Sequence, residues 1–163
     1  MKDMTPETEI TLDDAIKFLW SEADILDRND FDAWLPLWHG GHYIIPIGDE
    51  VTDFANNLNI VYDDAQMRKA RAARLSGGFS ISAAPPARTV RTLSRFVFTE
   101  EAPGAVTIRS ALHVIEDKFG RQRMFAANVE HKLIATENGI RITQKVVRLL
   151  NSDGMLTSIS YLF

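Results

Sequence analysis

The sequence contains no cysteine, and this absence removes several kinds of chemistry at once. Without thiols the chain cannot form disulfides, use a thiolate nucleophile, or hold a zinc ribbon or an iron–sulfur cluster through its own residues. It also lacks the Gly-x-Ser-x-Gly, phosphate-loop, dinucleotide-binding and His-Glu-x-x-His motifs of common enzyme families. No familiar catalytic motif is therefore present in the 163 residues.

Long apolar runs and a strong charge of one sign are absent as well. No stretch approaches the roughly 20 apolar residues that span a bilayer, and the acidic N-terminal segment lacks the apolar run of a signal peptide. The net charge of −4 creates no field that favours nucleic acid or an anionic membrane. We expect a soluble, cytoplasmic protein with one domain over residues 1–163 and with neither a nucleic-acid nor a membrane partner.

The first part of the chain has the period of helices. Residues 1–10 form a polar lead, and Thr11 is a suitable N-cap because two aspartates follow in the first turn. Apolar residues then recur at spacings of three and four as far as Asp27, and a shorter helix follows up to Pro36. The pattern predicts helices within residues 11–38.

The remainder alternates with the period of strands. We expect residues 42–163 to form mostly curved sheet, interrupted by one helix at 63–76 that Gly77 and Gly78 end. Pro46, inside the first strand, favours an edge position for that strand. Because the later strands are long, the sequence predicts an α+β fold: N-terminal helices packed on a strongly curved, mainly antiparallel sheet that forms a cone.

Alternation also assigns the strand faces. In the strand after the Pro-Pro segment, Val90, Phe96 and Phe98 fall on one face, and Arg91 and Arg95 fall on the other. The next strand has a mostly apolar face, formed by Val106, Ile108, Ser110, Leu112 and Val114. This face predicts a filled, apolar interior of the cone.

Histidines are the best candidates for acid–base chemistry. His39 and His42 lie three apart around a Gly-Gly pair, which is either a weak non-haem iron pattern or a polar strand end. His131 alternates with apolar residues and so faces the interior, where Tyr43 or Asp27 could orient it as a general base. The alternative is a core histidine with one hydrogen bond.

The predicted helix at 63–76 is strongly basic. Its exposed face is expected to carry Arg68, Lys69, Arg71 and Arg74. Nearby acidic residues and the lack of interleaved aromatic residues argue against nucleic-acid binding. Because arginine is enriched at protein interfaces, we interpret this region as an assembly surface. The interface candidates are Tyr62, Asp63, Asp64, Arg71, Arg74, Arg88, Arg91, Tyr161, Leu162 and Phe163.

Six segments, in order along nearly the whole chain, carry a family resemblance. They are FLWSEADILDRNDFDAWLPLW (18–38), YIIPI (43–47), YDD (62–64), RKARAARL (68–75), PPARTVR (85–91) and QKVVRLLNSDG (144–154). In these segments the chain resembles the β (small) subunit of aromatic-ring-hydroxylating dioxygenases, the Rieske non-haem iron oxygenases. Ala87 stands where many relatives have serine, which affects only a detail of one turn.

The resemblance implies the cone fold of the nuclear transport factor 2-like (cystatin-like) superfamily. It also implies a non-catalytic chain without a metal or cofactor of its own, bound to a large α subunit that holds the Rieske 2Fe–2S cluster and the mononuclear iron. Three α and three β subunits would form an oxidoreductase that dihydroxylates an aromatic compound in catabolism. The alternative is a stand-alone cone-fold isomerase or dehydratase, or a small-molecule-binding protein, with a pocket around His131, Tyr43 and Asp27.

Overall fold

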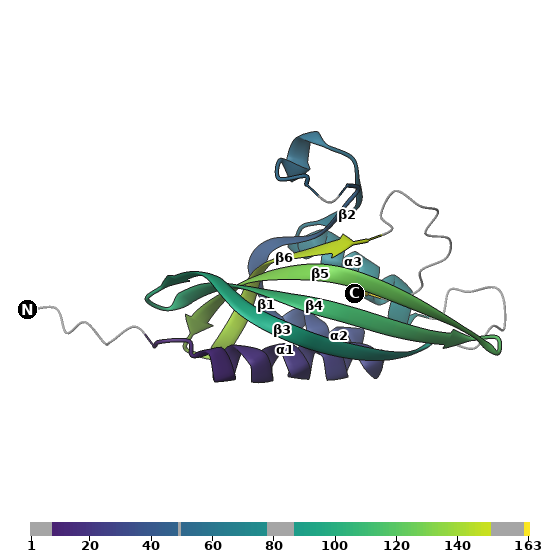
Figure 1. The fold of residues 1–163 in the computed structure, drawn as a ribbon, viewed down its shortest axis with the longest axis horizontal. Coiled ribbons are helices and arrows are strands. Elements are labelled where there is room, and N and C mark those ends of the chain that lie inside the picture. The colour runs from purple at the N-terminus through teal and green to yellow at the C-terminus, as the bar shows by residue number, and fades with distance from the viewer. Residues whose placement is uncertain (1–7, 49, 78–86, 151–161) are drawn as a thin grey trace, which may run out of the picture.

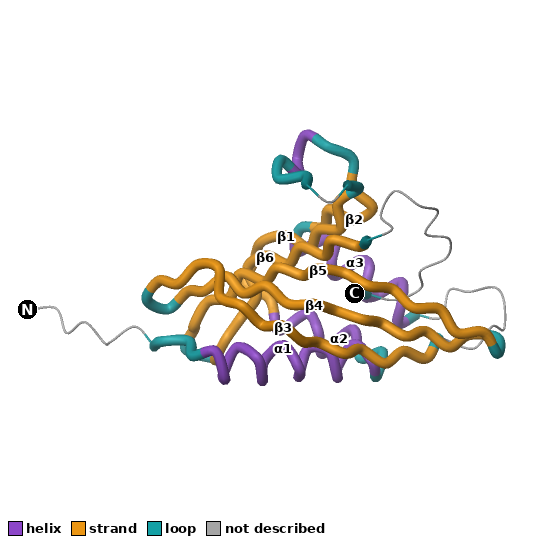
Figure 2. Tube along the Cα trace, viewed as in Figure 1, coloured by secondary structure: helices purple, strands orange, loops and turns teal. Residues whose placement is uncertain are grey.

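The computed structural model describes residues 8–48, 50–77, 87–150 and 162–163. Figure 1 labels the α-helices and strands of these residues, and Figure 2 colours them by type. The helices are α1 (Leu12–Asp27), α2 (Phe31–Trp34) and α3 (Ala65–Ser76). The strands are β1 (Trp38–Pro46), β2 (Asn59–Asp63), β3 (Arg88–Ala102), β4 (Ala105–Lys118), β5 (Arg121–Thr136) and β6 (Gly139–Leu149). No helix in these described ranges is long and apolar enough to cross a bilayer.

Helix α1 starts and ends where the sequence predicts. The hydroxyl oxygen of Thr11 accepts a hydrogen bond from Asp14 N at 3.1 Å, which caps the first turn. The helix lies along β3 and buries a face that includes Leu19 and Leu26 (Figure 1). Glu22 lies on this same buried face, so α1 carries one carboxylate into the interior.

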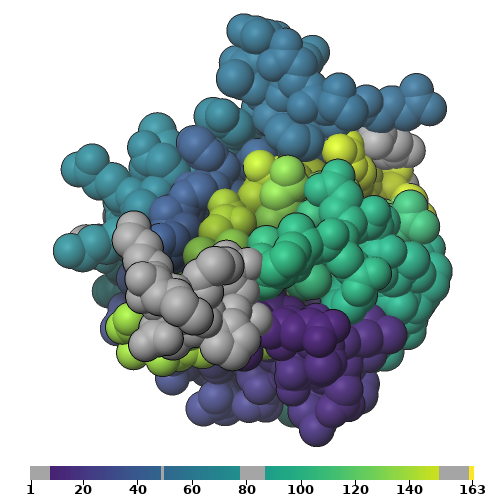
Figure 3. Space-filling view, turned by 90° about the vertical axis from the view of Figure 1, so that its left-hand side faces the viewer, coloured from purple at the N-terminus to yellow at the C-terminus, as the bar shows by residue number. Residues whose placement is uncertain are grey.

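The strands form one curved, unclosed sheet in the order β2-β1-β6-β5-β4-β3. Neighbouring strands are antiparallel except for β1 and β6, which run parallel. The helices pack against this sheet, and Figure 3 shows α1 in purple directly below β3 and β4 in teal. The predicted α+β class and the mainly antiparallel sheet are confirmed.

Strand β1 is an inner strand, so the expectation that Pro46 marks an edge is wrong. Pro46 is the last residue of β1, and the pairing with β2 shifts between Ile45 and Pro46. A proline is tolerated there because the strand ends and the regular ladder is already interrupted. One edge is formed by β2, a short strand that ends at Asp63, the residue at which the sequence predicts the start of a helix.

Helix α3 begins slightly later than predicted, because Asp63 is the last residue of β2. Asp64 is the N-cap, and its carboxylate accepts a hydrogen bond from Met67 N at 2.9 Å. Gly77 ends the helix as predicted, with its N–H bonded to a carbonyl of the last turn. Gly78 lies outside the described residues.

Gly40 and Gly41 form an irregularity where β1 approaches β6. Both have positive φ angles, +60° and +70°, and a Cβ at Gly41 would lie 1.5 Å from the backbone oxygen of Thr143. Arg68 of α3 donates to the carbonyls of Gly40 at 2.8 Å and Gly41 at 2.7 Å, and its guanidinium lies 3.9 Å from the ring centroid of Trp38. The prediction that Arg68 is exposed is wrong, because it binds these carbonyls in a buried position.

The predicted faces of β3 are wrong in its first half. Arg95 has a φ of +55°, and the pairing with β4 shifts just after Ser94. Before this bulge Arg91 is buried and Val90 is 63% exposed, whereas after it Phe96 and Phe98 pack on the core. A bulge adds a residue and reverses the alternation. It therefore brings a cation into the cone.

Candidate functional site

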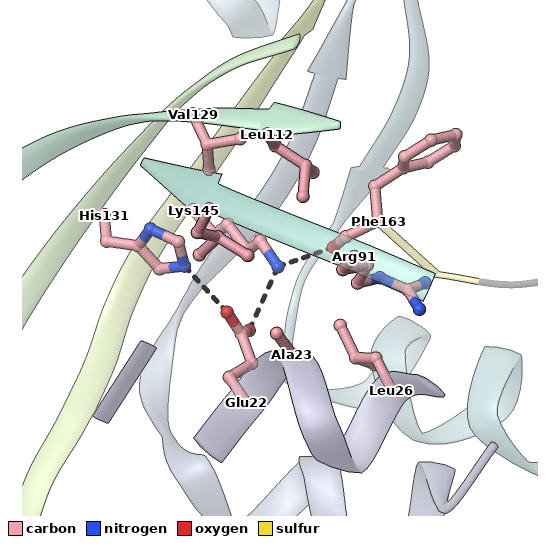
Figure 4. A pocket seen from close by; sticks show the side chains of 10 residues that line it. Glu22, Ala23, Leu26, Arg91, Leu112, Val129, His131, Lys145 and Phe163 are labelled. Carbon is pink, nitrogen blue, oxygen red and sulfur yellow. Dashed lines mark hydrogen bonds and ion pairs between the residues drawn. The ribbon is translucent and has the colours of Figure 1, made fainter. Parts of the chain in front are cut away.

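Three titratable side chains meet inside the cone: Glu22 of α1, His131 of β5 and Lys145 of β6 (Figure 4). One carboxylate oxygen of Glu22 lies 2.9 Å from His131 Nε2. The other accepts hydrogen bonds from Lys145 Nζ at 3.0 Å and from Trp34 Nε1 at 2.9 Å. His131 and Lys145 are directly opposed in the β5–β6 pairing. The three side chains are at most 3% exposed, so water does not screen their charges.

These groups determine one another's protonation. Burial alone would raise the pKa of Glu22, but Lys145, His131 and the hydrogen bonds from His131 and Trp34 outweigh it and hold the pKa well below its ordinary value. Burial lowers the pKa of His131 and of Lys145, and the Glu22 carboxylate opposes both shifts. At neutral pH we therefore assign a carboxylate, an ammonium and a neutral imidazole that donates its Nε2 proton to Glu22.

A second ion pair lies nearby, between Asp27 of α1 and Arg91 of β3. Arg91 donates to Asp27 Oδ1 at 2.5 Å through its guanidinium and to Oδ2 at 3.0 Å through its backbone N–H. The hydroxyl of Thr89 donates to the same carboxylate at 3.0 Å. Asp27 is thus bound to β3 and does not orient His131; the carboxylate beside His131 is Glu22.

The same interior holds Leu162 and Phe163, each 1% exposed. Side chains from three strands bind their backbone: Phe163 N donates to Tyr43 Oη at 3.0 Å, Lys145 Nζ donates to Phe163 O at 2.5 Å, and Arg91 donates to Leu162 O. The hydroxyl oxygen of Tyr43, the other expected partner of His131, therefore accepts from the chain itself. Burial raises the pKa of Tyr43 despite this hydrogen bond.

The space left beside these groups is a cavity of about 10 Å³, the room of a single water. Leu26, Leu112 and Val129 line it together with the polar side chains (Figure 4). His131 Nδ1 has no hydrogen-bond partner among the described residues. A general base must reach its substrate, and no organic substrate fits here. The cone is filled as predicted, but the expectation of an apolar interior is wrong because it contains buried ion pairs.

A known family matches most of the chain. The family model described as "Ring hydroxylating beta subunit" matches residues 21–153. The chain belongs to the ring-hydroxylating β-subunit family. This confirms the family resemblance of the sequence and does not favour a stand-alone isomerase or dehydratase.

Curated relatives of this β-subunit chain come from several bacteria. The anthranilate 1,2-dioxygenase small subunit of Acinetobacter baylyi is 24% identical over 141 residues, which cover 83% of this chain and 86% of the relative. The benzene 1,2-dioxygenase subunit beta of Pseudomonas putida is 25% identical over 160 residues, 90% and 86% of the two chains. The N,N-dimethyl phenylurea N-demethylase subunit beta of Sphingobium sp. is 28% identical over 153 residues, 90% and 84%.

Solved structures share the fold. The β subunit of the benzoate 1,2-dioxygenase from Burkholderia mallei has a TM-score of 0.80 at 20% identity and covers 95% of this chain and 99% of its own. Naphthalene 1,2-dioxygenase with bound indole has a TM-score of 0.78 at 18% identity, covering 100% and 88%. A scytalone dehydratase-like protein of Novosphingobium aromaticivorans reaches 0.62 at 9%, covering 83% and 80%. The predicted nuclear transport factor 2-like cone is confirmed.

The interface candidates of this β subunit fall into two groups. Tyr62, Asp64, Arg74 and Arg88 are exposed. The others that the structure describes are bonded inside the chain: Arg91, Leu162 and Phe163 in the cone, and Arg71 to the buried Asp63 at 2.5 and 3.1 Å. Tyr161 lies outside the described residues. A single chain does not test an interface, so the exposed group stays a prediction.

The His39 and His42 pattern forms no metal site with the other described residues. The ring of His42 stacks on Tyr62, with centroids 4.8 Å apart and planes at 17°. Within the described ranges, no three His, Cys, Asp or Glu side chains come close enough to hold a metal ion. The cysteine-free sequence also has no thiolate ligands for a Rieske cluster.

Sequence reasoning missed Glu22 and Lys145. A signal for Glu22 was present, because it lies three residues after Leu19 and four before Leu26, on the apolar stripe of α1. Lys145 alternates with the buried Val147 and Leu149, so the period of β6 was a signal for an inward position, but a lysine is rarely buried without a partner. The register shift next to Leu133 in the β5–β6 pairing separates this inward face from that of Ile142.

Proposed function

We propose that this chain is the non-catalytic, structural β subunit of a multicomponent aromatic-ring-hydroxylating dioxygenase. It binds a large α subunit that holds the Rieske cluster and the mononuclear iron, and three copies of each form a cytoplasmic enzyme of aromatic catabolism. The observation that carries this proposal is the family match over residues 21–153 of a chain whose interior, among the described residues, leaves a cavity of only about 10 Å³ beside His131. Its curated relatives include the small subunit of anthranilate 1,2-dioxygenase and the β subunit of benzene 1,2-dioxygenase.

The filled cone supports a structural role. A carboxylate beside a histidine resembles an acid–base pair, but here the carboxylate also accepts from Lys145 and Trp34. Through these two hydrogen bonds Glu22 of α1 links Trp34 of α2 and Lys145 of β6. A network of this kind rigidifies the subunit, and rigidity suits a scaffold that keeps neighbouring subunits in register.

The proposed docking residues are the exposed members of the candidate set. Arg74 at the end of α3 and Arg88 at the start of β3 present cations that are suited to carboxylates of a partner. Tyr62 and Asp64 add an aromatic ring and an acceptor near the start of α3. Arg71 is a poor choice for an assembly test, since its substitution would also break the pair with Asp63.

Co-expression with a candidate α subunit tests the proposal. We expect the two chains to co-purify at a fixed ratio, with a mass that fits three of each. Arg74→Glu combined with Arg88→Glu should reduce co-purification at least tenfold, while the melting temperature of the isolated β chain changes by only about 2 °C.

Lys69→Glu is the matched control, because Lys69 is exposed on the same helix but five residues from Arg74, on a different side. It should leave co-purification unchanged. A β chain that stays monomeric and never binds α would refute the subunit function. Equal loss in the control would refute this choice of surface but not the function.

A further inference from the structure

Leu162 and Phe163 are held in the cone as a ligand is held in a pocket. Their backbone groups meet the side chains of Tyr43 on β1, Arg91 on β3 and Lys145 on β6. Tyr43 lies 120 residues before Phe163 in the sequence, Arg91 lies 71 residues before Leu162, and Lys145 lies 18 residues before Phe163. Side chains of three different strands thus converge on two residues.

The polar part of this site has more donors than its carboxylates can use. Glu22 balances the charge of Lys145, and Asp27 balances that of Arg91. An ammonium carries three N–H donors and a guanidinium five, so each cation can also donate to further oxygen acceptors, as Arg91 does to Thr89 Oγ1 at 2.9 Å. The backbone oxygens of Leu162 and Phe163 are such acceptors.

The apolar part of the site accommodates an aromatic ring. The ring of Phe163 meets Phe125 edge-on, with centroids 5.6 Å apart and planes at 82°. Leu26, Leu112 and Val129 line the small cavity beside Phe163. Since about 10 Å³ remains empty there, the ring of Phe163 fills what is otherwise a ring-sized space.

We propose that the interior of the cone is a binding site for aromatic carboxylates, which the chain keeps occupied with its own Leu162 and Phe163. The matching ligand has a ring joined by two carbons to a carboxylate, because this reproduces the ring and backbone oxygen of Phe163. His131 lines the same cavity, and its Nδ1, unpartnered among the described residues, offers the ligand a further polar contact. This site is separate from the proposed assembly function and does not depend on it.

The test uses a chain that ends at Tyr161 and the probe 3-phenylpropionate, with thermal melting and calorimetric titration as readouts. The shortened chain should melt at a lower temperature and regain several degrees with millimolar probe, whereas the full chain should not respond. The probe should bind at least tenfold more tightly than propylbenzene, which lacks the carboxylate, and at least tenfold more tightly than propionate, which lacks the ring.

A folded shortened chain that does not bind the probe would overturn the proposal, as would an equal response of the full chain. Phe163→Ala decides the case if the shortened chain does not fold. This variant removes the ring but keeps the backbone oxygen on Lys145, so benzene should raise its melting temperature, and 3-phenylpropionate should do no better than benzene. No response to benzene would overturn the proposal as well.

Discussion

Replacing Glu22 with glutamine would remove one buried negative charge and keep the shape of the side chain. The two carboxylate oxygens accept from Trp34, His131 and Lys145. Glutamine has one acceptor oxygen and an amide that only donates. If the oxygen stays with Trp34 and Lys145, the amide faces His131, and the imidazole accepts from it once its proton moves from Nε2 to Nδ1.

The main cost of Glu22→Gln therefore falls on Lys145, which is 3% exposed and would be a buried cation without its counter-charge. Removing one partner of a buried ion pair costs about 3–5 kcal/mol, out of a total stability of about 5–15 kcal/mol. The double variant Glu22→Gln with Lys145→Met should regain at least half of this loss, because removing both charges leaves no unpaired ion.

Urea unfolding at pH 7 measures both free energies of unfolding. Asp24→Asn is the control, since Asp24 pairs with Arg28 on the exposed side of the same helix and should matter by less than about 0.5 kcal/mol. The reasoning is refuted if Glu22→Gln costs less than about 1 kcal/mol, or if the double variant is no more stable than the single one.

Two further predictions concern acid and backbone strain. The pKa values of His131 and Glu22 lie below their ordinary 6.5 and 4.5, so the unfolded chain takes up these protons first as the pH falls. Stability should therefore decline below about pH 6.5, with a slope of up to about 1.4 kcal/mol per pH unit and proton. In pH-dependent urea unfolding, His131→Gln should remove the part of this decline that lies above pH 4.5. Substitution of the exposed His113 by glutamine should leave the decline unchanged. Gly41→Ala should lower stability by more than about 3 kcal/mol, because its Cβ would overlap a backbone oxygen of β6. Gly40 has open space around it, so Gly40→Ala should cost only about 1–2 kcal/mol of backbone strain. A melting experiment in which the two glycine variants behave alike would contradict this prediction.

Local chemistry explains which parts of the fold were predictable. The N-cap of α1 at Thr11 and the C-cap of α3 at Gly77 follow from residue type alone, and both are confirmed. The inward face of β5 was also correct, since no bulge interrupts its pairing with β4. Two of the errors lie beside pairing shifts, at Arg95 in β3 and at Pro46 in β1. A shift depends on the partner strand, which alternation within one strand cannot reveal.

The interior site was predictable only in part. His131 was correctly placed inside, but its carboxylate comes from Glu22, and the charge that decides the state of that carboxylate comes from Lys145. The inward position of Arg91 follows from the bulge in β3. A histidine beside a buried carboxylate therefore does not by itself indicate catalysis. Catalysis also depends on the other partners of the carboxylate and on the free volume beside the histidine. Here Lys145 pairs with the Glu22 carboxylate, and Phe163 occupies the space that a substrate would need.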